Sequence, residues 1–406
     1  MVKPGYKQTE VGVIPEDWED KKLGEIGRVC MCKRIFADQT SDTGEIPFFK
    51  IGTFGKSADA YISRSLYEDF RRRFSYPKKG DVLISAAGTL GRSVVFDGKD
   101  AYFQDSNIVW LDADKEKLCN AYLNHYYKVI QWASSEGSTI ARLYNGIICN
   151  THIALPDIEE QEKIADVLSE MDELMSLTEK QLEKKKAIKQ GAMQELLTGK
   201  KRLPGFSGEW KAHRLGDLGM FVKGSGISRA ESNTGRIPAV RYGELYTTHQ
   251  NYVTHFVSHI SKEVATKAKQ VYKGDILFAA SGETKEEIGK CAAIIDDQTV
   301  YAGGDILILR PHEPYNPVFM GNLLNTEEVC RQRAEKGQGD AVVHIHADSL
   351  GRIKVKIPEI KEQDAIAEIL LGMDKEIEML EMKLEKYRQL KQGTMQQLLT
   401  GKIRLE

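Results

Sequence analysis

The side chains best suited to binding an anionic ligand form a short run of arginines in the first half of the chain. The run comprises Arg71, Arg72 and Arg73, flanked by Phe70 and Phe74 and followed by Lys78. Guanidinium groups bind phosphate oxygens, or the edge of a guanine, through paired hydrogen bonds. The alternative is a solvated helix face whose arginines are braced by Glu68 and Asp69. We predict nucleic-acid contact here, with phosphate favoured over base.

Two further groups of residues offer the same chemistry. The polar loop GSTIARLYNG contributes Thr139, Arg142 and Tyr144. The second half of the chain contributes Lys223, Ser225, Arg229, Arg236, Arg241 and Lys285. Basic and hydroxyl side chains of this kind contact the phosphates and base edges of nucleic acids, so all of these residues are candidate contacts.

No complete catalytic motif accompanies these residues. A phosphate-binding loop would end at Gly55-Lys56-Ser57, but Lys50 stands where its first glycine must be. Asn316-Pro317-Val318-Phe319 is similar to the NPPF loop of adenine methyltransferases without its second proline, and no FxGxG cofactor loop is present. The sequence therefore predicts no catalytic residues and no cofactor bound by this chain.

Metal ligation and membrane insertion are also not expected. The pairs His255/His259 and His344/His346 lack a cysteine or carboxylate set that would complete a site. The six cysteines are scattered with no CxxC pair, which is typical of reduced thiols. No apolar run approaches the roughly 20 residues that cross a bilayer, and the N-terminus lacks a signal-peptide core. We expect a cytoplasmic protein without metal.

Length and charge set further limits. A chain of 406 residues, 41% hydrophobic and 29% charged, is typical of two or three soluble globular domains. The formal net charge is −2, but residues 21–155 carry 19 Lys+Arg against 15 Asp+Glu, and residues 211–357 carry 19 against 17. Local basic patches can therefore contact phosphate, but this charge balance could not by itself support strong non-specific binding to nucleic acid.

The elements that must position these side chains are set by an internal repeat. Residues 155–203 and 357–405 align without a gap at an offset of 202, with 25 identities in 49 positions. In the second copy, apolar residues recur at spacings of four and three, as in a coiled coil: Ile366, Leu370, Met373, Ile377, Leu380, Leu384 and Tyr387. The first copy is weaker, with Thr178 and Lys185 in the seam, and Leu174, Leu177 and Ile188 indicate a drifting apolar stripe. We predict two antiparallel helices of about 40 residues, each capped by a glycine, Gly199 or Gly401.

A second, shorter repeated motif indicates that the repeat is circularly permuted. The pattern Trp-x4-Leu-Gly-(Glu/Asp)-x-Gly begins at Trp18 and again at Trp210, after the first repeated helix. The second helix ends where a third such segment would begin. The chain is thus expected to be a circularly permuted internal repeat with pseudo-two-fold symmetry and neighbouring termini.

Between the repeated segments lie two divergent stretches rich in predicted strands. In each, a Lys-Gly-Asp turn, at Lys79–Asp81 and Lys273–Asp275, leads into a β-branched run. With a helix over 115–133, this predicts α+β domains with small curved β-sheets. The expected division is 1–155 for the first domain, 156–203 for the central spacer helix, 204–357 for the second domain and 358–406 for the C-terminal spacer helix.

The identity between the two copies of the repeat varies along its length. Positions 189–203 match their counterparts at 12 of 15 places, against 13 of 34 for 155–188. One interpretation is packing of this end on the domains. The other is that each copy docks an equivalent partner chain. The candidate docking residues are Lys189, Gln190, Gln194, Lys200 and Arg202, with Lys391, Gln392, Gln396, Lys402 and Arg404.

Together these motifs resemble the specificity subunit of type I restriction–modification systems. The resemblance is carried by P-x-[IL]-x-EQ-x-x-IA-x-x-L at 156–168 and 358–370, by the two KQGxMQxLLTGK tails and by the two Trp segments, and it spans essentially the whole chain. It implies two target-recognition domains, each reading one part of an asymmetric, bipartite double-stranded DNA site, with the helices as spacers.

The resemblance also implies partners: two methylation subunits, to which translocating restriction subunits, again two, are added. The methyl donor and ATP are expected to bind those partners. The residues alone leave two alternatives open. One is a self-sufficient adenine methyltransferase, and the other is a structural coiled-coil scaffold indifferent to DNA sequence.

Overall fold

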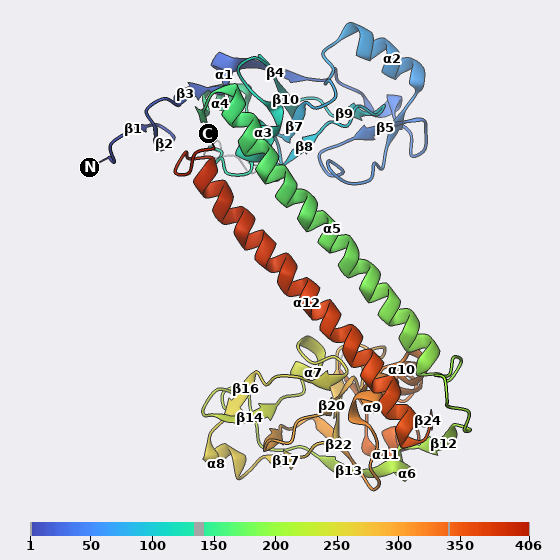
Figure 1. Ribbon diagram of the computed structural model, residues 1–406. Coiled ribbons are helices and arrows are strands. Elements are labelled where there is room, and N and C mark those ends of the chain that lie inside the picture. The colour runs from blue at the N-terminus through green and yellow to red at the C-terminus, as the bar shows by residue number, and fades with distance from the viewer. Residues whose placement is uncertain (1, 134–141, 340–341, 406) are drawn as a thin grey trace. The chain divides into compact units, whose positions relative to one another are not determined.

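The computed structural model describes residues 2–133, 142–339 and 342–405. The chain divides into two compact units: unit 1 is Met1–Glu179 with Lys383–Glu406, and unit 2 is Lys180–Met382. Two helices of 39 residues, α5 (Ile158–Leu196) and α12 (Ile360–Leu398), match the predicted pair, and the boundary between the units falls inside both. Each unit therefore contains one end of each helix (Figure 1).

The globular part of unit 1, residues 19–155, is called head 1 below. Its main antiparallel sheet has the order β4-β10-β7-β8, with β4 (Gly27–Met31), β10 (Ile108–Ala113), β7 (Val82–Ser85) and β8 (Ser93–Val95). A mixed sheet is formed by β6 (Tyr61–Ile62), β5 (Ile46–Phe49) and β9 (Tyr102–Phe103), which lie between strands of the main sheet in the chain. The helical segments are α1 (Leu23–Ile26), η1 (Ala37–Gln39), α2 (Arg64–Arg73), α3 (Asn120–Tyr127) and α4 (Asn145–Asn150).

The globular part of unit 2, residues 211–357, is called head 2. Its larger sheet has the order β13-β22-β18-β20-β15, with β13 (Gly219–Lys223), β22 (Ile306–Pro311), β18 (Ile276–Ala279), β20 (Cys291–Ile294) and β15 (Tyr252–Val253). The smaller sheet has β16 (Ser258–Ile260), β14 (Ile237–Val240), β21 (Val300–Ala302) and β17 (Lys269–Val271). Short strands β19 (Ser281–Gly282) and β23 (Val343–His344) pair with each other. The helices are α6 (Leu215–Leu218), α7 (Glu244–Thr247), α8 (Lys262–Ala265), α9 (Pro317–Leu324), α10 (Glu327–Ala334) and α11 (Ala347–Gly351).

The predicted Lys-Gly-Asp turns start the central strands of both heads. Gly80 and Gly274 adopt φ of +89° and +92°, a left-handed conformation that glycine tolerates best. The aspartate that follows each glycine is buried and accepts hydrogen bonds: Asp81 from the Lys78 amide at 2.8 Å, and Asp275 from Arg310 Nη2 at 2.7 Å. Each buried carboxylate thus fixes the turn from which β7 or β18 enters the sheet.

Each head is joined to the helices by a two-stranded ribbon at the same place in the repeat. β3 (Glu19–Lys22) pairs with β11 (His152–Leu155), and β12 (Lys211–Arg214) pairs with β24 (Lys354–Ile357). β11 runs directly into α5 and β24 into α12. The two units are therefore built to one plan, as the pseudo-two-fold repeat predicted.

The ends of the long helices belong to the hydrophobic cores of the heads. In unit 1, Ile164 and Leu168 of α5 and Leu398 of α12 are buried in one cluster with head residues such as Leu23. In unit 2, Ile366 and Leu370 of α12 occupy the equivalent cluster. Burying an aliphatic side chain contributes about 1.5–3 kcal/mol, so these residues attach each head firmly to its helices.

The coiled-coil seam follows the predicted positions. Thr178 is only 4% exposed, and its hydroxyl donates to the Leu174 carbonyl at 2.7 Å, so the seam buries this polar side chain with its hydrogen bond made. Leu174, Leu177 and Ile188 are 47%, 49% and 47% exposed. The predicted drift of the apolar stripe is therefore wrong, because these three residues lie outside the seam.

Within each unit, α5 and α12 run in opposite directions. In unit 1, Glu179 of α5 pairs with Arg388, whereas the earlier Glu160 pairs with the later Arg404. In unit 2, Lys185 pairs with Glu376, whereas the later Arg202 pairs with the earlier Glu362. Residues later in the first segment therefore pair with residues earlier in the second, as expected for antiparallel helices.

The first and last described segments of the chain meet in unit 1. An N-terminal hairpin of β1 (Tyr6–Thr9) and β2 (Gly12–Pro15) lies beside the end of α12, and the Tyr6 hydroxyl donates to the Gly401 carbonyl at 3.0 Å. Gly199 and Gly401, with φ of +68° and +66°, end the two helices as predicted.

One predicted helix is shorter than expected. The structure has α3 over Asn120–Tyr127 instead of a helix over 115–133. Before it, the Lys115 ammonium and the Asn120 amide both bond Asp81, which holds residues 115–119 in turns. Among the described residues, no helix is long and apolar enough to cross a membrane.

Candidate nucleic-acid and partner interfaces

The repeated tail of α12 is tied to unit 1 by Arg404. Its guanidinium donates to both oxygens of Glu160 at 2.7 and 2.8 Å, and to both oxygens of Asp17 at 2.9 and 2.8 Å. It also lies over the Trp18 ring, 5.7 Å from the centroid, while Trp18 Nε1 donates to Glu160 at 3.0 Å. The hydrogen bond from Arg404 lowers the pKa of the Asp17 carboxyl.

Unit 2 repeats this arrangement with the helices exchanged. Arg202, which follows α5, donates to both oxygens of Glu362 at 2.6 and 2.7 Å and lies 5.9 Å from the Trp210 centroid. Glu160 and Glu362 are 5% and 1% exposed. The repeated glutamates and arginines thus form equivalent ion pairs that join the end of one long helix to the beginning of the other.

The glutamine after each glutamate connects head and helix. Gln161 accepts from the Cys119 amide at 2.9 Å and donates to the Pro156 carbonyl at 2.9 Å. Gln363 accepts from the Asn316 amide at 3.0 Å and donates to the Pro358 carbonyl at 2.9 Å. The repeated Glu-Gln pair therefore has a structural role in each unit. The glutamate bonds the arginine that follows the opposite helix, and the glutamine bonds the head.

The ten candidate docking residues divide into two groups. The structure engages four of them within the chain: Arg202, Arg404, Lys189 with Asp374, and Lys391 with Asp172. The other six are exposed on the helices and their tails: Gln190, Gln194, Lys200, Gln392, Gln396 and Lys402. Packing within the chain therefore explains the first group, and docking stays a prediction for the second.

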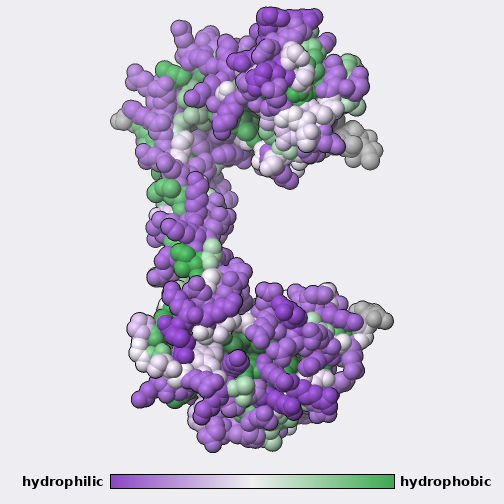
Figure 2. Space-filling view, turned by 90° about the vertical axis from the view of Figure 1, so that its right-hand side faces the viewer, coloured by the Kyte–Doolittle hydropathy of each residue, from purple (hydrophilic) through white to green (hydrophobic). Residues whose placement is uncertain are grey.

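Exposed apolar side chains also occur on the long helices that carry the second group. Ile188 and its repeat counterpart Leu390 are 47% and 54% exposed, and Leu177 and Met379 are 49% and 57% exposed. On the face shown in Figure 2, green patches interrupt the hydrophilic surface along the helices. Apolar residues at matched repeat positions are the kind of surface that a partner helix covers.

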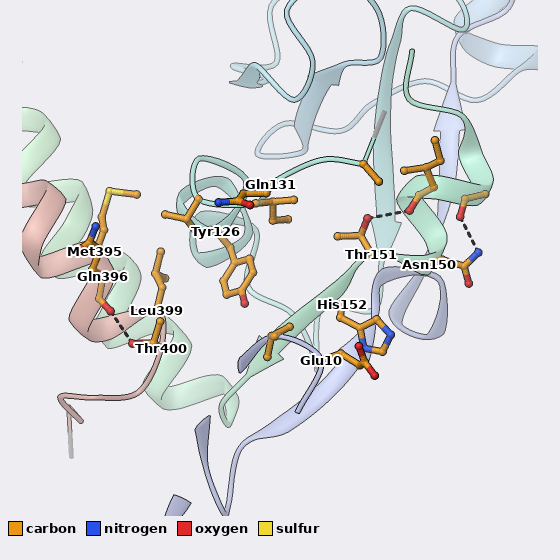
Figure 3. A pocket seen from close by; sticks show the side chains of 16 residues that line it. Glu10, Tyr126, Gln131, Asn150, Thr151, His152, Met395, Gln396, Leu399 and Thr400 are labelled. Atoms are coloured by element: carbon orange, nitrogen blue, oxygen red, sulfur yellow. Dashed lines mark hydrogen bonds between the residues drawn. The ribbon is translucent and has the colours of Figure 1, made fainter. Parts of the chain in front are cut away.

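A groove of about 810 Å³ opens in unit 1 beside the end of α12 (Figure 3). Its walls come from α12, α4 and the chain that follows α3. Apolar residues Met395, Leu399 and Ile147 line it together with the polar Gln396 and Thr400. The predicted docking residue Gln396 thus stands at the edge of a cavity with an apolar lining.

The arginine run lies in the last turn of α2. Arg72 and Arg73 both bond Asp69, at 3.4 and 2.7 Å, and Arg71 donates to the Tyr67 hydroxyl at 3.2 Å. All three remain exposed, as does Lys78. The bracing by Asp69 considered from the sequence is therefore present, and phosphate contact by these arginines stays a prediction.

The polar loop is described in part. Arg142 is half-buried, and its Nη2 donates to Ser106 Oγ at 3.1 Å and Asn107 Oδ1 at 3.0 Å, in the turn before β10. Tyr144 is 55% exposed. Thr139 lies outside the described residues. Arg142 therefore contacts a turn, Ser106–Asn107, whose residues were not among the candidates chosen from the sequence.

The six candidates of head 2 come from several segments of the chain. Lys223 ends β13, Ser225 follows it, and the Ser225 hydroxyl donates to the Lys267 carbonyl at 2.8 Å. The remaining four lie in separate turns: Arg229, Arg236, Arg241 and Lys285. Arg241 is half-buried and the other three are exposed. Each remains a predicted contact.

The histidine pairs do not form a metal site. No group of three or more His, Cys, Asp or Glu side chains suited to a metal ion occurs within residues 2–133, 142–339 and 342–405. His344 instead bonds Ser281, and His255 lies against His249 with ring centroids 5.9 Å apart.

The two repeated helical segments, residues 156–203 and 358–405, are called the frame below. Sequence analysis did not select several of the residues that hold it together. Glu160, Glu362, Asp172 and Asp374 are the carboxylate partners of the repeated basic residues, and each pair of carboxylates is itself separated by the repeat offset of 202. That offset was a signal available in the sequence. Lys128 and Tyr252, which bond Asp172 and Asp374 from the heads, carry no such signal because the heads differ.

Comparison with known proteins accounts for this architecture. The family described as type I restriction modification DNA specificity domain matches the chain twice, over residues 15–187 and 207–387. The chain belongs to this specificity family. Each match contains one head and most of the long helix that follows it, so the family model recognises both copies of the repeat.

Individual relatives agree with the assignment. A putative type I restriction enzyme specificity subunit of Haemophilus influenzae is 52% identical over 159 residues, which is 39% of this chain and 41% of that protein. A putative specificity subunit of Methanocaldococcus jannaschii is 25% identical over 99% of this chain and 97% of its own. A solved S subunit from M. genitalium has the same fold, with a TM-score of 0.62, 14% identity and 98% coverage of both chains.

Proposed function

We propose that this chain is the DNA-specificity subunit of a type I restriction–modification complex. Each head reads one part of an asymmetric, bipartite target, and the long helices set the length of the unread spacer. The observation that carries the proposal is the contrast between frame and heads. The ion pairs Arg404–Glu160 and Lys391–Asp172 recur at the repeat positions as Arg202–Glu362 and Lys189–Asp374, whereas the polar residues exposed on the two heads differ.

Unlike heads on equivalent frames imply unlike half-sites, because base identity is read by the particular side chains that reach base edges. The candidate contacts are the basic and hydroxyl residues of each head, with Arg71–Arg73 placed on phosphate. The spacing of two half-sites follows the geometry of the protein that binds them.

We assign the catalytic steps, methyl transfer and DNA cleavage, to partner chains. The sequence lacks a complete cofactor or phosphate loop. We therefore place methyl transfer, with its methyl donor, on two methylation subunits, and ATP-dependent cleavage on two restriction subunits. Docking of the methylation subunits is placed on the exposed repeat residues Gln190, Gln194 and Lys200 and their counterparts, beside the exposed apolar positions.

The test is to reconstitute the chain with the methylation subunit encoded beside it and to map methylated sites on random DNA. We expect a single asymmetric target in two parts. Exchange of residues 21–155 for those of another family member should change one part only. Methyl transfer by the isolated chain, or methylation without sequence preference, would contradict the proposal.

A further inference from the structure

Two aspartates at equivalent repeat positions each join three elements of one unit. Asp172 lies on α5 and Asp374 on α12, separated by the repeat offset of 202. Each accepts a lysine from the opposite long helix, and each also accepts a side chain from the head of its own unit. No other carboxylate of the two long helices, among the described residues, makes both contacts.

In unit 1 the head contact comes from the end of α3. Asp172 Oδ1 accepts from Lys391 of α12, and Oδ2 accepts from Lys128 Nζ at 3.2 Å. The buried His125 ring lies 3.9 Å from Oδ2 and bonds Ser169 of α5 at 3.1 Å. Burial alone raises the pKa of Asp172, but the hydrogen bond from Lys391 and the charge of Lys128 outweigh it and lower the pKa. The carboxylate therefore stays charged and holds both lysines.

In unit 2 a different side chain makes the equivalent contact. Asp374 Oδ1 accepts from Lys189 of α5, and Oδ2 accepts from the Tyr252 hydroxyl at 2.7 Å. Tyr252 lies in β15, the edge strand of the larger sheet. Burial and the bond to Asp374 raise the pKa of Tyr252, so its hydroxyl remains a donor. The heads thus reach the same repeat position with unrelated residues, Lys128 and Tyr252.

These contacts extend the attachment of each head along its long helix, beyond the core residues Leu168 and Leu370. Gln161 and Gln363 bond the heads at the start of α5 and α12. Asp172 and Asp374 each lie eleven residues further along, or about 16 Å at 1.5 Å per residue. A head that is attached only near the start of a helix can tilt about that end, and a further contact along the stiff helix restricts the tilt.

We propose that Asp172 and Asp374, with Lys128 and Tyr252, are positioning residues that fix the tilt of each head on the helix pair and thereby restrict the accepted spacer length. The inference rests on the proposed function. It adds that spacer length is set by these lateral contacts in addition to helix length. Loss of a contact broadens the accepted spacers without changing the bases read.

The test uses variants that remove only the head contact and leave the interhelix lysine in place. Lys128→Met acts on unit 1, and Tyr252→Phe, which deletes one oxygen atom, acts independently on unit 2. Lys163→Met, an exposed lysine of α5 with no ion pair among the described residues, is the matched control. Each is assembled with the methylation subunit and given DNA in which both half-sites are constant and the spacer varies by up to two base pairs.

We expect the wild type and Lys163→Met to methylate one spacer length. Lys128→Met and Tyr252→Phe should lose selectivity against neighbouring lengths by about tenfold, which corresponds to about 1.4 kcal/mol. An unchanged spacer profile, or an equal loss of methylation at all lengths, would overturn the inference while the proposed function stood. Failure of the wild-type complex to methylate any bipartite site would instead overturn the proposed function. If Lys128→Met does not fold, Tyr252→Phe alone decides between these results.

Discussion

Replacement of Arg202 by methionine tests whether the repeated ion pairs hold the frame together. Arg202 supplies both hydrogen bonds that the Glu362 side chain receives from side chains within the described residues. Glu362 is 1% exposed, so the variant leaves a buried carboxylate without a counter-ion. Removing one partner of a buried ion pair costs about 3–5 kcal/mol, since the remaining charge is uncompensated.

The same change in unit 1 should cost less. In Arg404→Met, Glu160 keeps the Trp18 Nε1–H at 3.0 Å and the Leu405 amide at 3.4 Å. A hydrogen bond to a charged group contributes about 1.5–3 kcal/mol. Against this, Arg404→Met also loses the exposed pair with Asp17, which contributes about 0–1 kcal/mol. Arg202→Met should therefore exceed Arg404→Met by about 1–2 kcal/mol.

Hydrogen exchange on the full chain measures each unit separately. In Arg202→Met, amides of residues 362–371 should exchange about a hundredfold faster or more, because each 1.4 kcal/mol is a factor of about ten. Adding Glu362→Gln should restore most of the protection, because a neutral amide is cheaper to bury unpaired. A larger effect of Arg404→Met on residues 160–169, or no rescue by Glu362→Gln, would refute the reasoning.

Three further outcomes are expected. Burial lowers the pKa of His125 to about 4, so its contribution to stability is present above pH 6.5 and lost as the pH falls toward 4; His125→Gln should flatten the fall in melting temperature between pH 7 and 5, which is worth roughly 2 kcal/mol at most. Gly401→Ala should lower stability by about 1–3 kcal/mol, measured by denaturant unfolding, and Gly199→Ala by less, since the added Cβ lies 2.4 Å from Pro15 in the first case and 3.4 Å from Trp210 in the second. Insertion of four residues near 178 and 380 lengthens each helix by about 6 Å, so the methylated spacer should grow by one to two base pairs with both half-sites unchanged.

The two long helices were predicted well from the sequence because the segment that forms them is repeated. A constant offset of 202 located α5 and α12, and the spacing of apolar residues located the seam. It failed at Leu174, Leu177 and Ile188, whose hydrophobicity was interpreted as packing although their side chains are exposed. Periodicity gives the faces of a helix, but it does not show which apolar residues a neighbouring element covers.

The heads were predictable only in outline. The Lys-Gly-Asp turns marked the central strands because a positive φ and a buried aspartate leave a local signature. Contacts such as that of Arg142 with Ser106 and Asn107 bring together residues some 35 positions apart, and they leave no such pattern. Side chains that reach DNA are set by contacts of this second kind, which is why candidate residues could be chosen by type but not gathered into one surface.

The meeting of the first and last segments in unit 1 bears on the order of events during synthesis. Trp18 and Leu23 are buried in one hydrophobic cluster with Leu398 and Leu399, so the core of unit 1 is incomplete until residues 383–405 have left the ribosome. Unit 2, by contrast, draws only on residues 180–382 and can close earlier. Unit 1 is therefore completed only after the residues of unit 2 have been synthesised, and the apolar side chains around Trp18 and Leu23 lack these partners until then.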